Sequence, residues 1–81
     1  LKINVLVVDP PRSGLSDSML EIIKSIEIDQ IIYVSCNPST LAKNLEVLQT
    51  EYDILEITPY DMFSHTPLIE TVVNLRRKTD Q

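Results

Sequence analysis

The chain has 81 residues, 43% of them hydrophobic, and it carries a formal net charge of -5 at pH 7. A chain of this length makes one small domain at most, while the hydrophobic share is too high for a disordered tail. The acidic balance excludes a general attraction for polyanions, and a single cysteine excludes both an internal disulfide and a thiolate metal cluster.

The first part of the chain is predicted to form a strand, a loop and a helix. Residues 3–8, INVLVV, are a nearly continuous β-branched run, as in a strand covered on both faces. Residues 9–14, DPPRSG, are rich in turn formers and indicate a loop. Apolar residues then recur at helical spacing over residues 15–26, where Ser18 with Glu21 fits a capping box.

A second strand and a second helix follow. Residues 31–35, IIYVS, are typical of a buried strand. A second amphipathic helix is predicted from the helical spacing of Leu41, Leu45, Leu48 and Tyr52. Asn37 is expected at the N-cap of this helix and Pro38 in its first turn, positions that suit both residue types.

The last part of the chain is predicted to hold two strands without a helix between them. These are residues 54–58, ILEIT, and residues 69–76, IETVVNLR. Strands joined through helices run parallel in one sheet, whereas a strand reached by a loop most simply returns antiparallel. The chain is therefore predicted to have an α/β fold, a sheet of three parallel strands plus a final antiparallel strand, with two helices on its faces.

Three reactive side chains are expected at one edge of this sheet. Asp9 ends the first predicted strand, Cys36 ends the second, and Glu70 lies near the start of the fourth. The carboxyl ends of parallel strands line the ligand crevice of open α/β sheets, and an antiparallel strand begins at that edge. Cys36 also precedes a helix N-terminus, whose free N–H groups and dipole favour a thiolate. The pattern indicates a nucleophile and two carboxylates in one crevice.

Each of these residues also has an ordinary interpretation. An aspartate before two prolines forms turns, and a lone cysteine at a strand end is often a small buried hydrophobic residue. A glutamate in a strand is usually solvated. A non-catalytic fragment, or a degenerate paralogue that acts only as a binding module, is therefore the alternative to an enzyme.

Three motifs together carry a resemblance to a known family. The stretches DPPRSGL, YVSCNPSTLAKN and DMFSHTPLIETVV resemble the C-terminal part of RNA uracil-5-methyltransferases. These enzymes use S-adenosylmethionine to form 5-methyluridine in transfer or ribosomal RNA. The resemblance covers essentially the whole chain and implies the C-terminal half of a Rossmann-like methyltransferase sheet.

The resemblance also implies roles for individual residues. Cys36 matches the nucleophile that adds to C6 of the uracil, and Glu70 matches the base that removes the C5 proton. Asp9 matches the aspartate at the cofactor and target-base site, while Arg12 and His65 are expected to contact the RNA substrate. The target base has to leave its stack for C6 to reach the thiol.

The sequence departs from the family pattern at three positions. Ser64 stands where the family usually has proline, and Leu68 where it has histidine. Asn44 replaces an aspartate that is common after the cysteine motif. Leu68 puts one substrate or supporting contact in doubt, while the nucleophile and the base are intact.

Other parts of such an enzyme do not occur in this sequence. Gly14 is the only glycine, so the glycine-rich loop that holds the cofactor is expected before Leu1, together with any RNA-binding domain or iron–sulfur cluster. Residues 1–81 are therefore predicted to be a C-terminal fragment of the catalytic domain, inactive by itself.

The setting of the protein is expected to be cytoplasmic and away from membranes. No apolar run approaches the roughly 20 residues of a membrane span, and no signal peptide opens the chain. The full-length protein is expected to bind transfer or ribosomal RNA. The fragment alone is expected to self-associate through an exposed sheet edge, because unpaired strand edges template further pairing.

Overall fold

The computed structural model describes residues 2–61 and 69–79, which form a single mixed sheet and two helices. The elements in chain order are β1 (Lys2–Val8), α1 (Asp17–Ser25), β2 (Glu27–Ser35), α2 (Pro38–Leu48), β3 (Tyr52–Asp61) and β4 (Ile69–Arg77). Their types and order agree with the sequence analysis. The second helix is shorter than predicted, because Tyr52 lies in β3, where its side chain is buried in the core.

The two helix starts show how capping sets the boundaries. At α2 the prediction is confirmed, since Asn37 is the N-cap and its side chain accepts a hydrogen bond from the Ser39 N–H at 3.0 Å. At α1 the prediction of Ser18 as the cap is wrong. Ser16 has an extended backbone and its side chain accepts a hydrogen bond from the Met19 N–H at 3.2 Å, so the helix begins two residues earlier than predicted.

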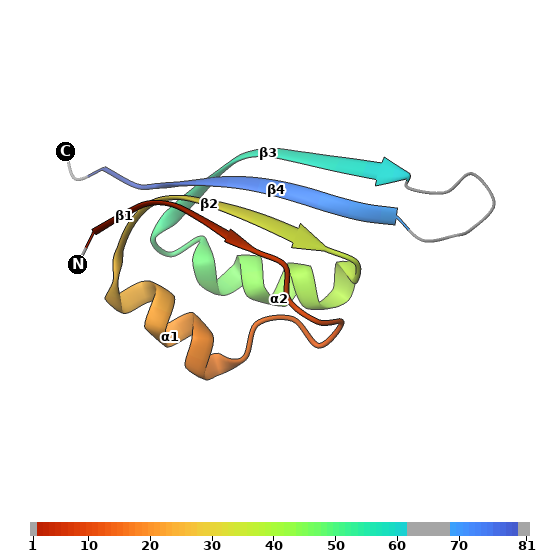
Figure 1. Ribbon diagram of the computed structural model, residues 1–81, viewed down its shortest axis with the longest axis horizontal. Helices are drawn as coiled ribbons and strands as arrows, with labels where there is room; N and C mark the ends of the chain where they lie inside the picture. Colours follow the sequence, from red (N-terminus) through yellow and green to blue (C-terminus); the bar gives the residue numbers. More distant parts are fainter. Residues whose placement is uncertain (1, 62–68, 80–81) are drawn as a thin grey trace.

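The strand order of the described sheet is β1-β2-β4-β3 (Figure 1). β1 pairs with β2 in parallel, and β4 pairs antiparallel with both β2 and β3. The antiparallel final strand is confirmed. Three adjacent parallel strands are not confirmed, because only β1 and β2 pair in parallel. β3 runs in the same direction as β2, but β4 lies between them and pairs antiparallel with both.

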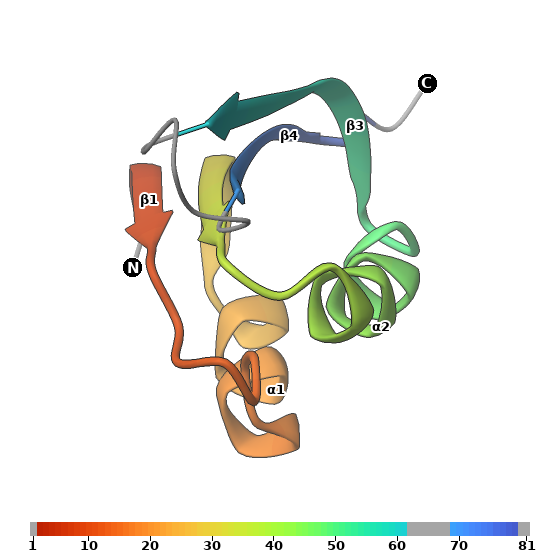
Figure 2. The same ribbon diagram turned by 90° about the vertical axis from the view of Figure 1, so that its right-hand side faces the viewer.

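Both helices lie on the same side of the curved sheet, as Figure 2 shows. The prediction of helices on both faces is therefore wrong for the described residues. The steps from β1 to β2 and from β2 to β3 run in the same direction across the strand order, and crossovers of one hand then place both helices on one face. Val5 and Val7 are 49% and 64% exposed on the other face, which is called the open face below.

The core lies between the helices and the covered face of the sheet. β4 is central, and its residues Val73 and Leu75 are fully buried. The buried hydrophobic residues are Leu20, Ile23, Ile28, Ile31, Tyr33, Leu41, Leu45, Leu48, Tyr52, Val73 and Leu75. This core fixes α2 against β2 and β4, and it thereby fixes the segment between β2 and α2.

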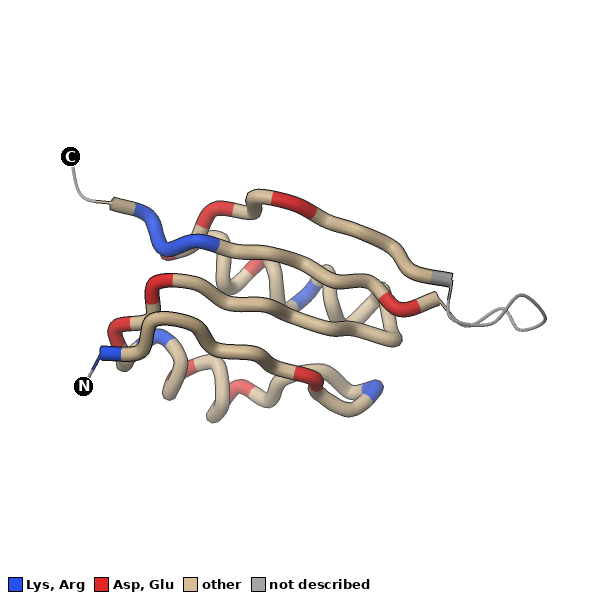
Figure 3. Tube along the Cα trace, turned by 45° about the horizontal axis from the view of Figure 1, so that its top comes forward, with Lys and Arg blue, Asp and Glu red and all other residues tan. Residues whose placement is uncertain are grey.

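In β1, β2 and β4 the charged residues lie toward the ends of the strands, whereas β3 also carries a charged residue in its middle (Figure 3). At the end of the sheet near both termini, Arg77 pairs with Glu27 at 3.2 Å and Lys2 lies 3.8 Å from Asp29. No helix in the described part of the chain has the length and apolarity that crossing a membrane requires.

Candidate active site

The pairing register brings the three predicted site residues to one edge of the sheet. The last pair between β2 and β4 is Ser35 with Thr71, and one residue further the same register leads to Cys36 and Glu70. Asp9 directly follows the end of β1, whose register with β2 is parallel. Figure 1 shows that β1 and β2 run toward the end of the sheet at which β4 begins. The predicted edge is therefore common to all three residues.

The three residues also share a face. Glu70 lies opposite Tyr60 in β3, on the side of the sheet away from the helices. Asp9 continues the row of Val5 and Val7, and Cys36 continues the corresponding row of β2, because side chains alternate along a strand. Asp9 is exposed, while Cys36 and Glu70 are half-buried. Strand alternation thus assigns all three residues to the open face.

The loop after β1 is shaped by a tight turn. The Gly14 N–H donates to the Pro11 carbonyl at 2.8 Å, and Gly14 has a φ of +79°. A Cβ on Gly14 would lie 2.8 Å from the Asn44 side-chain oxygen and 3.0 Å from Thr40 Cβ. Glycine is needed here for both the left-handed backbone and the close approach to α2.

One face of α2 holds this loop through three polar side chains. The Arg12 carbonyl accepts hydrogen bonds from Asn37 Nδ2 at 2.9 Å and from Thr40 Oγ1 at 3.0 Å. Asn44 Oδ1 accepts from the Leu15 N–H at 2.8 Å, and its Nδ2 donates to the Leu15 carbonyl at 3.2 Å. The loop that carries Asp9 is therefore tied to the helix that begins after Cys36.

The backbone on both sides of Cys36 is fixed by a local hydrogen-bonded turn. The Asn37 N–H donates to Ser35 Oγ at 3.1 Å, and the Ser35 hydroxyl lies 3.0 Å from the Asn37 carbonyl. Ser35 is buried, and Cys36 is a free thiol. The turn holds the thiol at the N-terminus of α2, where the helix dipole favours an anion.

Tyr33 lies beneath this region, with its side chain fully buried. Its hydroxyl donates to Asn44 Oδ1 at 2.6 Å. Burial raises the pKa of Tyr33 above its ordinary value of 10.0, the Leu15 N–H opposes this, and the charge of Cys36 adds to it. Burial is the main cause of this raised pKa, and the phenol lies in the core below the site.

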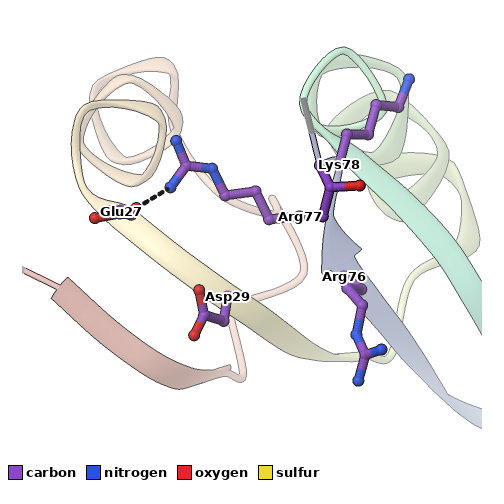
Figure 4. A pocket seen from close by; sticks show the side chains of 6 residues that line it. Glu27, Asp29, Arg76, Arg77 and Lys78 are labelled. Atoms are coloured by element: carbon purple, nitrogen blue, oxygen red, sulfur yellow. Dashed lines mark ion pairs between the residues drawn. The ribbon is translucent and has the colours of Figure 1, made fainter. Parts of the chain in front are cut away.

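In the part of the chain that the structure describes, one cavity lies beside the predicted site residues and another lies far from them. A cavity of about 420 Å³ borders Asp9 and is formed by the loop and the start of α1, from Val8 to Met19. A cavity of about 530 Å³ lies at the opposite end of the strands (Figure 4). It is lined by Glu27, Asp29, Arg76, Arg77, Lys78 and Thr79. Only the first adjoins the predicted site residues.

Three residues discussed in the sequence lie outside the part of the chain that the structure describes, and two residues that hold the loop after β1 were not predicted to do so. His65, Ser64 and Leu68 lie outside the described residues. From the sequence, Asn37 is predicted only as a helix cap, and Asn44 is noted only because it replaces an aspartate common in the family. Their spacing with Thr40, three and then four residues apart, is the signal that could have revealed a polar face on α2.

Comparisons with known proteins point to one family. The family model described as tRNA (Uracil-5-)-methyltransferase matches residues 1–78. A Bacillus cereus protein named "Uncharacterized RNA methyltransferase" is 48% identical over 75 residues, covering 93% of this chain and 16% of the relative. A tRNA/tmRNA (uracil-C(5))-methyltransferase of Marinomonas sp. is 47% identical over 75 residues, covering 93% of this chain and 20% of the relative.

A solved structure agrees with these sequence relatives. It is the crystal structure of Pyrococcus abyssi tRNA (uracil-54, C5)-methyltransferase in complex with S-adenosyl-L-homocysteine. The TM-score is 0.80 at 42% sequence identity, and the match covers 89% of this chain and 18% of that chain. The chain therefore spans less than a quarter of the length of the relatives that it matches.

Proposed function

Because the chain belongs to the tRNA (uracil-5-)-methyltransferase family, we propose that it is the C-terminal part of an enzyme that methylates C5 of a uridine in RNA. The methyl donor is S-adenosylmethionine, and the protein is cytoplasmic. The Pyrococcus relative, solved with S-adenosyl-L-homocysteine, supports this choice of donor. Transfer RNA is the favoured substrate, because both relatives with a named substrate carry tRNA in their names.

The observation that carries the proposal is the register of β2 with β4. It sets Cys36 opposite Glu70 one residue beyond the last strand pair, and it places Asp9 at the end of the next strand. A nucleophile and a base that act in turn on adjacent ring atoms must lie within reach of one base. Neighbouring strands supply that spacing without help from a mobile loop.

Cys36 begins the reaction as the nucleophile. Its thiolate adds to C6 of the uracil, the C5–C6 double bond opens, and the electron pair spreads over C5 and O4. S-adenosylmethionine, when bound, supplies an electrophilic methyl group to the electron-rich C5. The half-buried position of Cys36 supports this role, because the thiol directly follows β2 and lies next to the N-terminus of α2, the positive end of the helix dipole.

Glu70 completes the reaction as the base. It removes the proton from C5, the electron pair of that bond restores the C5–C6 double bond, and the Cys36 thiolate leaves C6. Glu70 is half-buried on the open face beside Tyr60. A carboxylate in that place faces the same side of the sheet as the row that Cys36 continues.

Asp9 and Arg12 bind rather than react in this scheme. Asp9 is an exposed carboxylate beside the cavity of about 420 Å³, and it accepts hydrogen bonds from the cofactor or from the uracil N3–H. Arg12 is exposed at the tip of the same loop and pairs with an RNA phosphate. His65 is proposed as a further RNA contact on the resemblance alone.

The described residues fit the cofactor at one point only. They offer the Asp9 carboxylate, but Gly14 packs against α2 and provides no glycine-rich loop for the cofactor. The rest of the cofactor site is assigned to the part of the relatives' length that the chain does not span. The 81 residues alone are accordingly proposed to be inactive.

The proposal is tested with the full-length protein and a methyl-labelled cofactor. Unmodified transfer RNA and ribosomal RNA transcripts are incubated separately, and nucleosides are identified by mass spectrometry. The expected product is 5-methyluridine. A label on cytidine or on an exocyclic amino group would contradict the proposal, and RNA binding without any methyl transfer would favour the binding-module alternative.

A further inference from the structure

We propose that Asn44 is a positioning residue for the candidate active site, because its side-chain amide fixes the loop that carries Asp9 relative to Cys36. The inference rests on the proposed function for the roles of Asp9 and Cys36. It adds a residue of α2 that lies eight positions after the thiol and contacts neither the substrate nor the cofactor.

Asn44 makes three hydrogen bonds while only 6% exposed. Its Oδ1 accepts from the Leu15 N–H at 2.8 Å and from the Tyr33 hydroxyl at 2.6 Å, and its Nδ2 donates to the Leu15 carbonyl at 3.2 Å. The amide thus pairs with both backbone groups of one residue, as a neighbouring strand would. A primary amide offers a donor and an acceptor side by side, which suits that geometry.

The loop has little internal structure that could replace these bonds. Pro10 and Pro11 have no N–H to donate, and the one backbone bond described within the loop joins Gly14 to Pro11. The other hydrogen bonds that hold the loop backbone come from side chains of α2 and its N-cap. Asn37 and Thr40 donate to the Arg12 carbonyl, and Asn44 accepts from the Leu15 N–H. The position of the loop is therefore set by the helix.

The same helix sets the position of the thiol. α2 begins two residues after Cys36, and Asn37 both caps it and contacts the loop. Asn44 closes the arrangement one to two turns further along, where Gly14 approaches its side-chain oxygen. Without Asn44, the bonds from Asn37 and Thr40 to the Arg12 carbonyl remain, but the end of the loop at Leu15 is no longer held to α2.

The test separates this role from a contribution to stability by a set of variants in the full-length protein. Asn44→Leu keeps the size of the side chain but removes all three hydrogen bonds. Asn44→Asp keeps the two acceptor contacts and loses the donor. Tyr33→Phe removes the buried hydroxyl and leaves both Leu15 contacts in place. Asn74→Leu is the matched control, since it removes the 2.7 Å bond from Gln30 in the sheet.

The kinetic readout is kcat and KM for RNA methylation beside the melting temperature. We expect Asn44→Leu to lower kcat about 10- to 100-fold, because misplaced reacting groups cost rate rather than binding. KM for RNA changes less than about threefold, and Asn44→Asp recovers part of kcat. Tyr33→Phe lowers the melting temperature yet keeps kcat within about threefold. A kcat that follows the melting temperature across all four variants would overturn the proposal.

Hydrogen exchange gives a readout that does not depend on the activity. Asn44→Leu should accelerate exchange of the backbone amides over residues 12–16, whereas Asn74→Leu should leave them unchanged. Unchanged exchange in Asn44→Leu would overturn the proposal even in an active enzyme. An inactive wild-type protein with accelerated exchange in Asn44→Leu would refute the proposed function while supporting the role of Asn44.

Discussion

Cys36 directly follows β2 and Glu70 lies in β4, and because these two strands pair, one hydrogen-bonded register brings the two residues close together. The last pair of that register, Ser35 with Thr71, joins a buried residue to a half-buried one in the middle of the sheet. Side chains held by central strands are positioned more firmly than side chains on loops. This supports a reaction in which the thiol and the carboxylate act successively on one base.

Glu70 is predicted to be needed for the second half of the reaction and not for the first. Glu70→Gln leaves Cys36 able to attack C6, but removal of the C5 proton slows by about 10²- to 10⁴-fold, the usual contribution of a general base. The methylated adduct then accumulates with ordinary uridine RNA and appears on a denaturing gel.

Glu56→Gln is the control for this variant. Glu56 is an exposed carboxylate of β3 that accepts a hydrogen bond from the Thr58 hydroxyl at 3.1 Å, away from the candidate site. It should turn over normally and show no accumulated adduct. Turnover of Glu70→Gln at the wild-type rate would contradict the assignment of the base.

Tyr33 is predicted to make the protein less stable in alkali. Burial is the main cause that raises the pKa of Tyr33 above 10.0. The folded state then holds the phenol proton more tightly than the unfolded state, so this stability is present below pH 10.0 and is lost as pH rises through the raised pKa. The urea concentration at the midpoint of unfolding should decrease as the pH rises above about 10.

The variant Tyr33→Phe isolates this effect. It should flatten the alkaline fall without abolishing it, because burial also raises the pKa of Tyr52. An alkaline fall of the same steepness in wild type and Tyr33→Phe would contradict the interpretation.

At the scale of elements, α2 joins the two halves of the candidate site. Its N-cap, Asn37, accepts from the Ser39 N–H and also donates to the Arg12 carbonyl at 2.9 Å. The N-cap of α1, Ser16, only caps its helix. Its side chain accepts a hydrogen bond from the Met19 N–H, and no hydrogen bond to the site residues is described for it. Comparing variants of the two caps therefore distinguishes the effect of helix stability from the effect of loop position.

Asn37→Ala and Ser16→Ala form a matched pair for this distinction. Each removes one cap and should destabilise the protein by about 1 kcal/mol. Only Asn37→Ala should also lower kcat, by about tenfold, because it releases the loop that carries Asp9. Chemical denaturation and steady-state kinetics measure the two effects. Equal loss of kcat in both variants would show that the loop contact of Asn37 has no separate role.

Local patterns predicted the elements well and their partners poorly. The cap at Asn37 was predictable because its residue type and the following Pro38 act within one helical turn. Ser18 was mistaken for a cap because Ser16 fits equally well, and only the extended backbone of Ser16 distinguishes them. Asn44 could not be assigned, since its partners Leu15 and Tyr33 are 29 and 11 residues away.

At the scale of the whole molecule, strand order limited what the sequence could predict. The run of residues 3–8 was interpreted as a strand covered on both faces, yet Val5 and Val7 are exposed in the structure. The antiparallel direction of β4 followed from the lack of a helix before it, but its position between β2 and β3 depends on pairing across the sheet. Asp9, Cys36 and Glu70 still lie at the same edge of the sheet, because the directions of their strands alone decide at which edge each residue lies.

The proposed mechanism is tested most directly by detecting the covalent bond between Cys36 and the RNA. The full-length protein is incubated with S-adenosylmethionine and RNA that contains 5-fluorouridine, which has no C5 proton for Glu70 to remove. The wild-type protein should give a slow-migrating protein–RNA band that survives denaturation, and Cys36→Ala should give none. If Cys36→Ala still forms that band, another residue is the nucleophile, and the edge shared by β2 and β4 is not the catalytic centre.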